Sequence, residues 1–274
     1  MESQRIIKLK LTQNWNAVAD DKWSDLSFNP EGLTLNPLQI FKSENGNFTI
    51  LKEIQKRKVV VKKTANRTGV RGIVDAIRTP KSLRNFKTAQ VLKQKNIEAA
   101  EPVAALWHKS LGNIYVTEYI ENSLNLYEIA FGKNPEILNS FSARKSIIKE
   151  TAELVAKLHK AGLWHRDPKA GNFIVYKDNG NYKVKLIDLD GIKPNIIDSR
   201  ERRTRTLANL AKTLTRFKTV NLADLYRGLK IYCDKMEING VRSLFHKLER
   251  TTVAMRLLTV LEESKKFKEQ CRSK

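Results

Sequence analysis

The sequence predicts an α+β fold with two lobes, a small strand-rich lobe followed by a mostly helical one. Strand signals dominate between residues 38 and 120, whereas helical periodicity dominates from Leu207 onward. One alternating stretch near residue 120 separates the two halves. The chain has 274 residues, which is enough for one large domain or for two small lobes that share a cleft.

The first lobe is expected to consist of strands around one helix. Residues 38–63 have the pattern of hairpin strands, with Gly46 in an Asn-rich turn between them. The β-branched run of residues 59–61 is typical of a buried strand. Apolar side chains at helical spacing predict a helix over residues 81–95, and alternation predicts one more strand over residues 114–120.

The second lobe is expected to be helical around one hairpin. Apolar side chains three and four residues apart predict a helix that Ser142 caps and that ends at Lys160. The Asp-Asn-Gly-Asn sequence of residues 178–181 is a strong turn signal between two short strands. From Leu207 onward the apolar spacing is helical.

The net charge of the chain is +22, with 51 Lys and Arg residues against 29 Asp and Glu. Between Lys56 and Lys95 there are 13 basic residues and one acidic residue, so this segment alone contributes 13 − 1 = +12. A second basic cluster runs from Arg200 to Lys218. Such a field attracts nucleic acid, anionic lipid surfaces or polyanionic substrates, and it does not choose among them.

The sequence also favours a cytoplasmic location. No run approaches the roughly 18 apolar residues of a transmembrane helix. Residues 1–5 lack the basic and then apolar layout of a secretory signal. The only cysteines are Cys233 and Cys271, which indicates a reducing compartment and no disulfide framework.

Residues 158–191 contain every group that phosphoryl transfer requires. The reaction needs a carboxylate near the attacking hydroxyl, oxygen ligands for Mg²⁺, and a cation on the transferred group. Asp167 is the candidate base or orienting group, and Lys169 is the candidate cation. Asn172 and Asp188 are the candidate metal ligands, with Asp190 as an additional candidate.

Two motifs in this stretch resemble those of protein kinases. His-Arg-Asp-Pro-Lys-Ala-Gly-Asn at residues 165–172 resembles the catalytic loop, with Lys169 two residues and Asn172 five residues after the Asp. Ile-Asp-Leu-Asp-Gly at residues 187–191 resembles the Asp-Phe-Gly metal motif, with Asp190 in place of the Gly. The resemblance implies a bilobal protein-kinase-like fold, with ATP and Mg²⁺ as cofactors.

More narrowly, the chain resembles the lipopolysaccharide kinase (Kdo/WaaP) family. The shared motifs are Leu-His-Lys-Ala-Gly-Leu-Trp-His-Arg-Asp at residues 158–167, Asn-Phe-Ile-Val at residues 172–175 and Ile-Asp-Leu-Asp at residues 187–190. The resemblance covers roughly residues 35–235. It implies domain boundaries at residues 1–34 (an N-terminal extension), 35–120 (an N-lobe with the nucleotide-binding sheet and a helix) and 121–274 (a C-lobe with the catalytic loop).

The same resemblance implies a kinase that phosphorylates a sugar hydroxyl, of Kdo or heptose, in the lipopolysaccharide inner core. The implied location is the cytoplasmic face of the inner membrane, where the protein would be peripheral. An anionic glycolipid acceptor and an anionic membrane surface agree with the basic charge, since each surface Lys or Arg adds about 1 kcal/mol of attraction there. The charge alone does not exclude nucleic acid as a partner.

The nucleotide site is placed by position in the family pattern. Lys62 follows the β-branched run and is the candidate that contacts the α- and β-phosphates; strand alternation sends Lys62 and Lys63 to opposite faces, so only one points into the cleft. The turn at Gly46 could cover the phosphates, although the chain has no GxGxxG motif. The backbone from Glu118 to Ile120 is expected to contact adenine.

Two other functions stay open. A protein kinase, or a phosphotransferase for another small molecule, would use the same residues. However, no Ala-Pro-Glu follows Asp188, and about fifteen residues separate Gly191 from the helix near Leu207, too few for a long regulatory loop. A non-catalytic pseudokinase or basic binding module would explain Asn85, which stands where the family pattern has a Glu that pairs with the Lys. The intact set of Asp167, Asn172 and Asp188 argues against that alternative.

Overall fold

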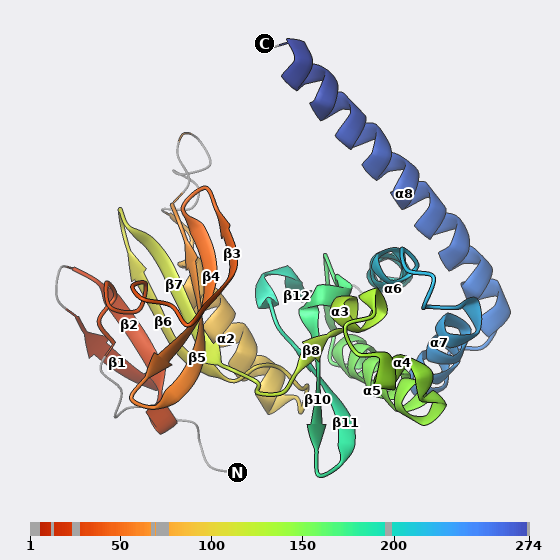
Figure 1. Ribbon diagram of the computed structural model, residues 1–274, viewed down its shortest axis with the longest axis horizontal. Helices are drawn as coiled ribbons and strands as arrows, with labels where there is room; N and C mark the ends of the chain where they lie inside the picture. Colours follow the sequence, from red (N-terminus) through yellow and green to blue (C-terminus); the bar gives the residue numbers. More distant parts are fainter. Residues whose placement is uncertain are drawn as a thin grey trace. The chain divides into compact units, whose positions relative to one another are not determined.

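The chain forms two compact units, Met1–Glu121 and Asn122–Lys274. The first is built on a large sheet and the second is mostly helical (Figure 1), which confirms the predicted α+β class. The computed structural model describes residues 6–11, 14–23, 28–66, 69, 77–194 and 199–272. Residues 67, 68 and 70–76 of the basic segment between Lys56 and Lys95 therefore lie outside the described residues.

The first unit is organised around an antiparallel sheet with strand order β1-β2-β6-β7-β5-β4-β3. Strands β1 and β2 belong to this sheet, although they lie within the predicted extension 1–34. A 3₁₀ helix, η1 (Asp21–Trp23), follows β2. The strands are β1 (Ile6–Lys10), β2 (Asn16–Asp20), β3 (Gln39–Glu44), β4 (Asn47–Ile54), β5 (Arg57–Thr64), β6 (Pro102–His108) and β7 (Gly112–Glu118).

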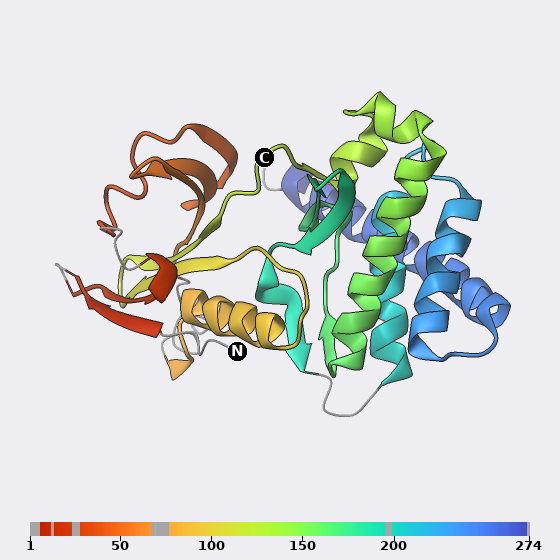
Figure 2. The same cartoon turned by 90° about the horizontal axis from the view of Figure 1, so that it is seen from below.

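The two faces of the sheet are covered differently. One face holds an apolar core that includes Trp15, Phe28 and Val61. The other face is covered by helix α2 (Lys81–Gln94), which packs against β6 and β7 (Figure 2). The helix predicted over residues 81–95 is thus present, and the left-handed Asn96 (φ 53°) follows its end.

Three hairpin turns within the described residues each contain two consecutive left-handed residues. Asn179–Gly180 has φ values of 48° and 78°, and Asn45–Gly46 has 47° and 73°. These are the residues that tolerate such angles best, so both hairpins were visible in the sequence. Gln55–Lys56 joins β4 to β5 with φ values of 48° and 65°, and no residue type marks that turn in advance.

In the part of the second unit that the structure describes, there are six helices and two small sheets. Its sheets have the orders β11-β10-β8 and β12-β9. The helices are α3 (Leu126–Phe131), α4 (Pro135–Asn139), α5 (Phe141–Lys160), α6 (Arg200–Leu214), α7 (Leu222–Met236) and α8 (Val241–Arg272). The strands and 3₁₀ helices are β8 (Leu124–Asn125), β9 (Leu163–His165), η2 (Ala170–Asn172), β10 (Phe173–Asp178), β11 (Asn181–Leu186), η3 (Leu189–Gly191) and β12 (Ile192–Pro194).

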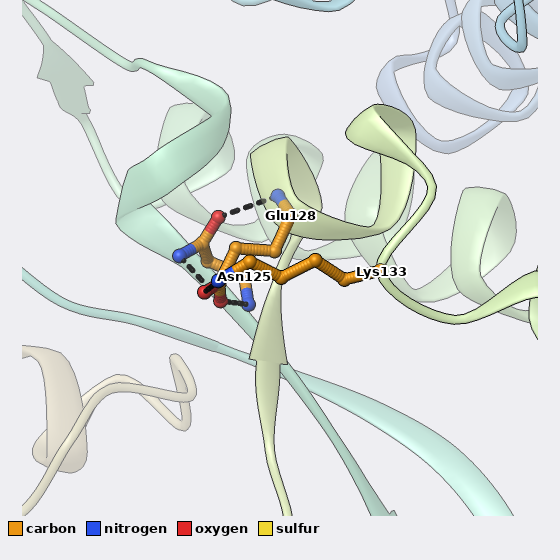
Figure 3. A network of polar contacts seen from close by, with 3 residues as sticks. All are labelled: Asn125, Glu128 and Lys133. Carbon is orange, nitrogen blue, oxygen red and sulfur yellow. Dashed lines mark hydrogen bonds and ion pairs between the residues drawn. The ribbon is translucent and has the colours of Figure 1, made fainter.

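Asn125 joins the start of this unit to the hairpin that follows the catalytic loop. It pairs with Ile174 of β10, and its Oδ1 accepts a hydrogen bond from Glu128 N at 2.9 Å at the start of α3. Glu128 Oε2 accepts from Asn125 N at 3.1 Å in return, and Glu128 Oε1 contacts Lys133 Nζ at 2.5 Å (Figure 3). This capping box fixes the angle between β8 and α3, which in turn packs against η2.

Two predicted helix starts are wrong. Helix α5 is capped by Ser140, whose Oγ accepts from Ala143 N at 3.2 Å, and Ser142 lies inside its first turn. Helix α6 begins at Arg200, well before Leu207, and only residues 192–199 separate it from Gly191. Its first two turns are rich in Arg and Thr, so apolar spacing could not reveal them.

None of the helices that the structure describes is both long and apolar enough to cross a bilayer.

Candidate active site

The catalytic loop is held in shape by its own backbone and by Asn172. Lys169 N donates to Asp167 O at 3.0 Å, and Asn172 N donates to Lys169 O at 2.8 Å. The side chain of Asn172 also donates from Nδ2 to Asp167 O at 3.3 Å. This contact uses the amide nitrogen, so the amide oxygen Oδ1 is the atom of Asn172 that suits a cation.

Asp167 and Lys169, the predicted base and cation, lie side by side. Lys169 Nζ is 3.0 Å from Asp167 Oδ2, and the two side chains are 62% and 53% exposed. An ion pair with this exposure contributes about 0–1 kcal/mol, so it does not lock either group. Both side chains therefore stay accessible to solvent, and neither is held firmly by the other.

His165 is a buried residue that supports the backbone of the loop. It is 2% exposed, and its Nδ1 accepts from Asp167 N at 3.2 Å. Burial lowers the pKa of His165, although the nearby carboxylates of Asp188 and Asp167 oppose the shift. A neutral ring can accept the Asp167 N–H, whereas an imidazolium cannot. His165 therefore orients the backbone of Asp167 and is not itself exposed to a substrate.

Gly191 has no side chain, and the ring of His165 occupies the space where a Cβ would lie. A Cβ at residue 191 would lie 2.4 Å from His165 Cε1 and 2.5 Å from Nδ1. We expect Gly191→Ala to destabilise the protein by about 1–3 kcal/mol, because a buried ring must move. Gly171→Ala is the matched control, since a Cβ there meets nothing within 4 Å. Urea denaturation measures both variants, and equal stabilities would contradict the tight packing.

Asp188 has a strained backbone at the predicted metal motif. Its φ and ψ are 56° and 69°, in the left-handed region, and its side chain is exposed. Phe173 pairs with Leu186, and Ile187 N donates to Asn172 O at 2.9 Å just beyond that pair. The hairpin therefore brings the two predicted metal ligands to the same end. Strain of this kind costs of order 1–3 kcal/mol and is typical of functional sites.

Helix α6 holds the catalytic loop with three polar side chains on one face. Thr206 Oγ1 donates to His165 O at 3.0 Å, and Asn209 Nδ2 donates to Arg166 O at 3.2 Å. Thr213 Oγ1 accepts from the first backbone N–H of η2 at 3.0 Å. The spacing of three and four residues places all three on one helical stripe. Sequence reasoning missed this stripe; its signal was polar residues at helical spacing directly after the metal motif.

Thr206→Val tests whether this stripe supports catalysis. The substitution keeps the shape of a side chain that is 1% exposed and leaves His165 O without its donor. We expect the free energy of unfolding to fall by about 1–3 kcal/mol. We also expect a lower kcat under conditions in which the variant is fully folded. Thr204→Val is the matched control, because its buried hydroxyl bonds only to Arg200 O of the same helix in the contacts described. Equal kcat values for the two folded variants would contradict a role for the stripe.

In the first unit, the sheet separates Lys62 from Lys63. Lys63 Nζ lies 5.7 Å from the ring centre of Phe48, which packs on the face opposite α2. Lys62 is paired with Tyr115, which clusters with Phe86 of α2. Of the two lysines, Lys62 therefore lies on the α2 side. Asn85 of α2 is 5% exposed and is one of the residues that the helix buries.

Gly46 and the segment Glu118–Ile120 also belong to the first unit. The turn that contains Gly46 is tied to the end of β5, because Asn47 Oδ1 accepts from Ala65 N at 3.0 Å. Glu118 ends β7, and its side chain accepts from Glu101 N at 3.3 Å. Glu121, the next residue after Ile120, is the last residue of the first unit, so the predicted adenine-contacting segment lies at the end of that unit.

A pocket of about 510 Å³ lies elsewhere, among helices α3 to α8. Its lining is mainly apolar and contains none of the predicted site residues. The candidate site is therefore identified by its polar geometry and not by this cavity.

Known proteins resemble the chain in sequence and in fold. The model of the "Lipopolysaccharide kinase (Kdo/WaaP) family" matches residues 47–232. The solved structure of WaaP in complex with acyl carrier protein matches with a TM-score of 0.59 and 17% identity, over 85% of this chain and 94% of that chain. The Neurospora crassa PAN3 pseudokinase mutant gives a TM-score of 0.43 and 15% identity, over 87% and 66%. No curated protein sequence matches the chain.

Proposed function

Because the chain belongs to the lipopolysaccharide kinase (Kdo/WaaP) family, we propose that it transfers the γ-phosphoryl group of ATP to a sugar hydroxyl, of Kdo or heptose, in the lipopolysaccharide inner core. The observation that carries the proposal is the exposed pair of Asp167 and Lys169 beside the hairpin end that holds Asn172 and Asp188. Members of this family are kinases, so ATP is the expected donor.

Asp167 acts on the acceptor in this proposal. Its carboxylate takes the proton of the sugar hydroxyl as the oxygen bonds to the γ-phosphorus and the bond to ADP breaks. Lys169 leaves Asp167 and places its charge beside the transferred group. The weak, exposed ion pair between them supports this exchange of partners.

Asn172 and Asp188 would hold Mg²⁺, which neutralises the phosphate charge when it is bound. They offer an amide oxygen and a carboxylate at the same end of the hairpin. Magnesium usually takes one or two protein ligands and completes its shell with phosphates and water. No group of three or more His, Cys, Asp or Glu residues within the described ranges could hold a metal. A site of two protein ligands therefore fits the donor set.

Lys62, Gly46 and the Glu118–Ile120 backbone would bind the nucleotide. Lys62 would contact the α- and β-phosphates, and the Gly46 turn would cover them. Lys62 lies on the α2 side of the sheet. Helix α2 contains Asn85, at the position where the family pattern has the Glu that pairs with the Lys, and this supports the assignment. The protein would work as a peripheral protein at the cytoplasmic face of the inner membrane, where its charge of +22 favours an anionic glycolipid.

A transfer assay tests this function. Purified protein is incubated with labelled ATP, Mg²⁺ and core glycolipids that lack phosphate on the acceptor sugar, and label is expected in the glycolipid. Label that enters protein but no glycolipid would favour the protein-kinase alternative. An absence of label together with an absence of thermal stabilisation by Mg-ATP would favour a pseudokinase.

A further inference from the structure

The antiparallel pair of β9 and β12, which lies directly before the catalytic loop, has an exposed face with cationic side chains. In this antiparallel pair His165 lies opposite Ile192, and both are buried. The next pair, Trp164 and Lys193, therefore lies on the other face, where Lys193 is exposed and Trp164 is half-buried.

Two arginines extend this face. The guanidinium carbon of Arg202, on α6, lies 5.5 Å from the ring centre of Trp164. Arg166 is exposed and follows Trp164 by two residues, the strand repeat that returns a side chain to the same face. Its backbone N–H donates to Gly191 O at 2.8 Å, so the ribbon pairing continues to this residue. Trp164, Arg166, Lys193 and Arg202 are called the Trp164 face below.

The chemistry of the Trp164 face suits an acidic sugar. An indole offers a flat apolar surface on which the C–H face of a sugar ring can pack, and its edge stays polar. Arginine forms paired hydrogen bonds with carboxylates and phosphates, and lysine adds a point charge. The indole with Arg202 beside it, together with Lys193 and Arg166 on the same face of the strand pair, thus provides both the apolar surface and the charge that such a ligand needs.

The Trp164 face also lies within one or two sugar rings of Asp167. Asp167 follows Trp164 by three residues, which limits their Cα separation to roughly 10 Å. That is about the length of one or two sugar rings. Helix α6 carries Arg202 and also holds the catalytic loop through Thr206 and Asn209. One rigid element therefore sets the position of this face relative to Asp167.

We propose that the Trp164 face is the acceptor subsite that binds an anionic sugar, bearing a carboxylate or a phosphate, next to the sugar whose hydroxyl is phosphorylated. This inference rests on the proposed function and names the part of the acceptor that is recognised. The subsite holds the acidic group while Asp167 receives the hydroxyl of the neighbouring sugar.

Acceptor kinetics of Arg202→Gln and Lys193→Gln test the subsite. Each variant is expected to raise the KM for the core glycolipid by about tenfold, the effect of one charge-assisted hydrogen bond. The KM for ATP is expected to stay constant, and Lys193→Arg to restore the acceptor KM. Lys177→Gln is the matched control, since Lys177 Nζ lies 5.2 Å from the ring centre of Tyr182 at the other end of β10.

Modified acceptors identify the acidic group. The assay is repeated with glycolipid whose carboxylates are reduced to alcohols, with phosphatase-treated glycolipid, and with glycolipid treated both ways. The variant effect is expected to vanish with the doubly treated acceptor and with whichever single treatment removes the recognised group. An effect that persists on the doubly treated acceptor would overturn the subsite, as would equal KM values on the untreated one.

Direct binding separates the subsite from the proposed function. Calorimetry measures how wild type and Arg202→Gln bind the untreated glycolipid, with no need for transfer. If wild type labels no glycolipid, the proposed function fails, and the calorimetric comparison alone decides the subsite. If wild type labels the glycolipid and Arg202→Gln binds it as well as wild type does, only the subsite is wrong.

Discussion

Asp167→Asn is expected to lower kcat for phosphoryl transfer by about 10²- to 10⁴-fold, the usual contribution of a general base. The amide keeps the size of the side chain but cannot accept the acceptor proton. Asp167 is exposed and its ion pair with Lys169 is weak, so the fold loses little. Nucleotide binding is expected to stay nearly intact, because no predicted nucleotide contact involves this side chain.

Steady-state kinetics and the thermal shift with Mg-ATP measure these two effects separately. Asp178→Asn is the matched control, since Asp178 is an exposed aspartate at the tip of the neighbouring hairpin. Asp167→Ala should behave as Asp167→Asn does. Wild-type turnover in either Asp167 variant would show that the assigned role is wrong.

Asp188→Asn is expected to remove the Mg²⁺-dependent part of nucleotide binding and to lower kcat by about 10²- to 10³-fold. The substitution replaces one carboxylate oxygen, the ligand that Mg²⁺ prefers, by an amide nitrogen. Asparagine tolerates the left-handed conformation that residue 188 adopts, so the fold should keep its stability. When Mg-ATP is present at 100 times its Kd, it raises the free energy of unfolding of the wild-type protein by about 2.7 kcal/mol. The variant should lose most of this stabilisation.

Asp188→Ala separates backbone strain from metal binding. Alanine at φ 56° adds roughly 1–2 kcal/mol of strain, so this variant should be less stable than Asp188→Asn without any metal. Thermal unfolding with Mg-ATP, with ATP and EDTA, and without nucleotide measures both effects. Stabilisation by Mg-ATP that is as large in Asp188→Asn as in wild type would refute the metal role.

Much of the second unit could be predicted from local sequence because its signals are local. The Asp-Asn-Gly-Asn turn defines the hairpin of β10 and β11, whose register brings Asn172 and Asp188 together. The motif from His165 to Asn172 is contiguous, so its residues were found together. The family match over residues 47–232 confirms the resemblance that these motifs indicated.

The parts that escaped prediction depend on contacts between distant segments. Thr206 and Asn209 look like ordinary helix residues, and only the fold shows that they bond to the catalytic loop. Alternation predicted that Lys62 and Lys63 point to opposite faces of the sheet. Only the position of α2 shows that Lys62 is the one on the helix-covered face. Arg202 stood in a basic run, and its place over Trp164 depends on the packing of α6 against β9.

The two N-terminal strands have a consequence for solubility. In the sheet, β2 lies beside β6, whose Val103, Ala104, Ala105 and Leu106 are all 0% exposed. Without β2, one side of this apolar strand would present unpaired backbone groups, which is how sheets recruit other chains and aggregate. The outermost strand, β1, carries the exposed Lys8, a charge that discourages such pairing. Strands β1 and β2 lie outside the family match, yet they cover an edge of the sheet whose strands β4 to β7 lie within it.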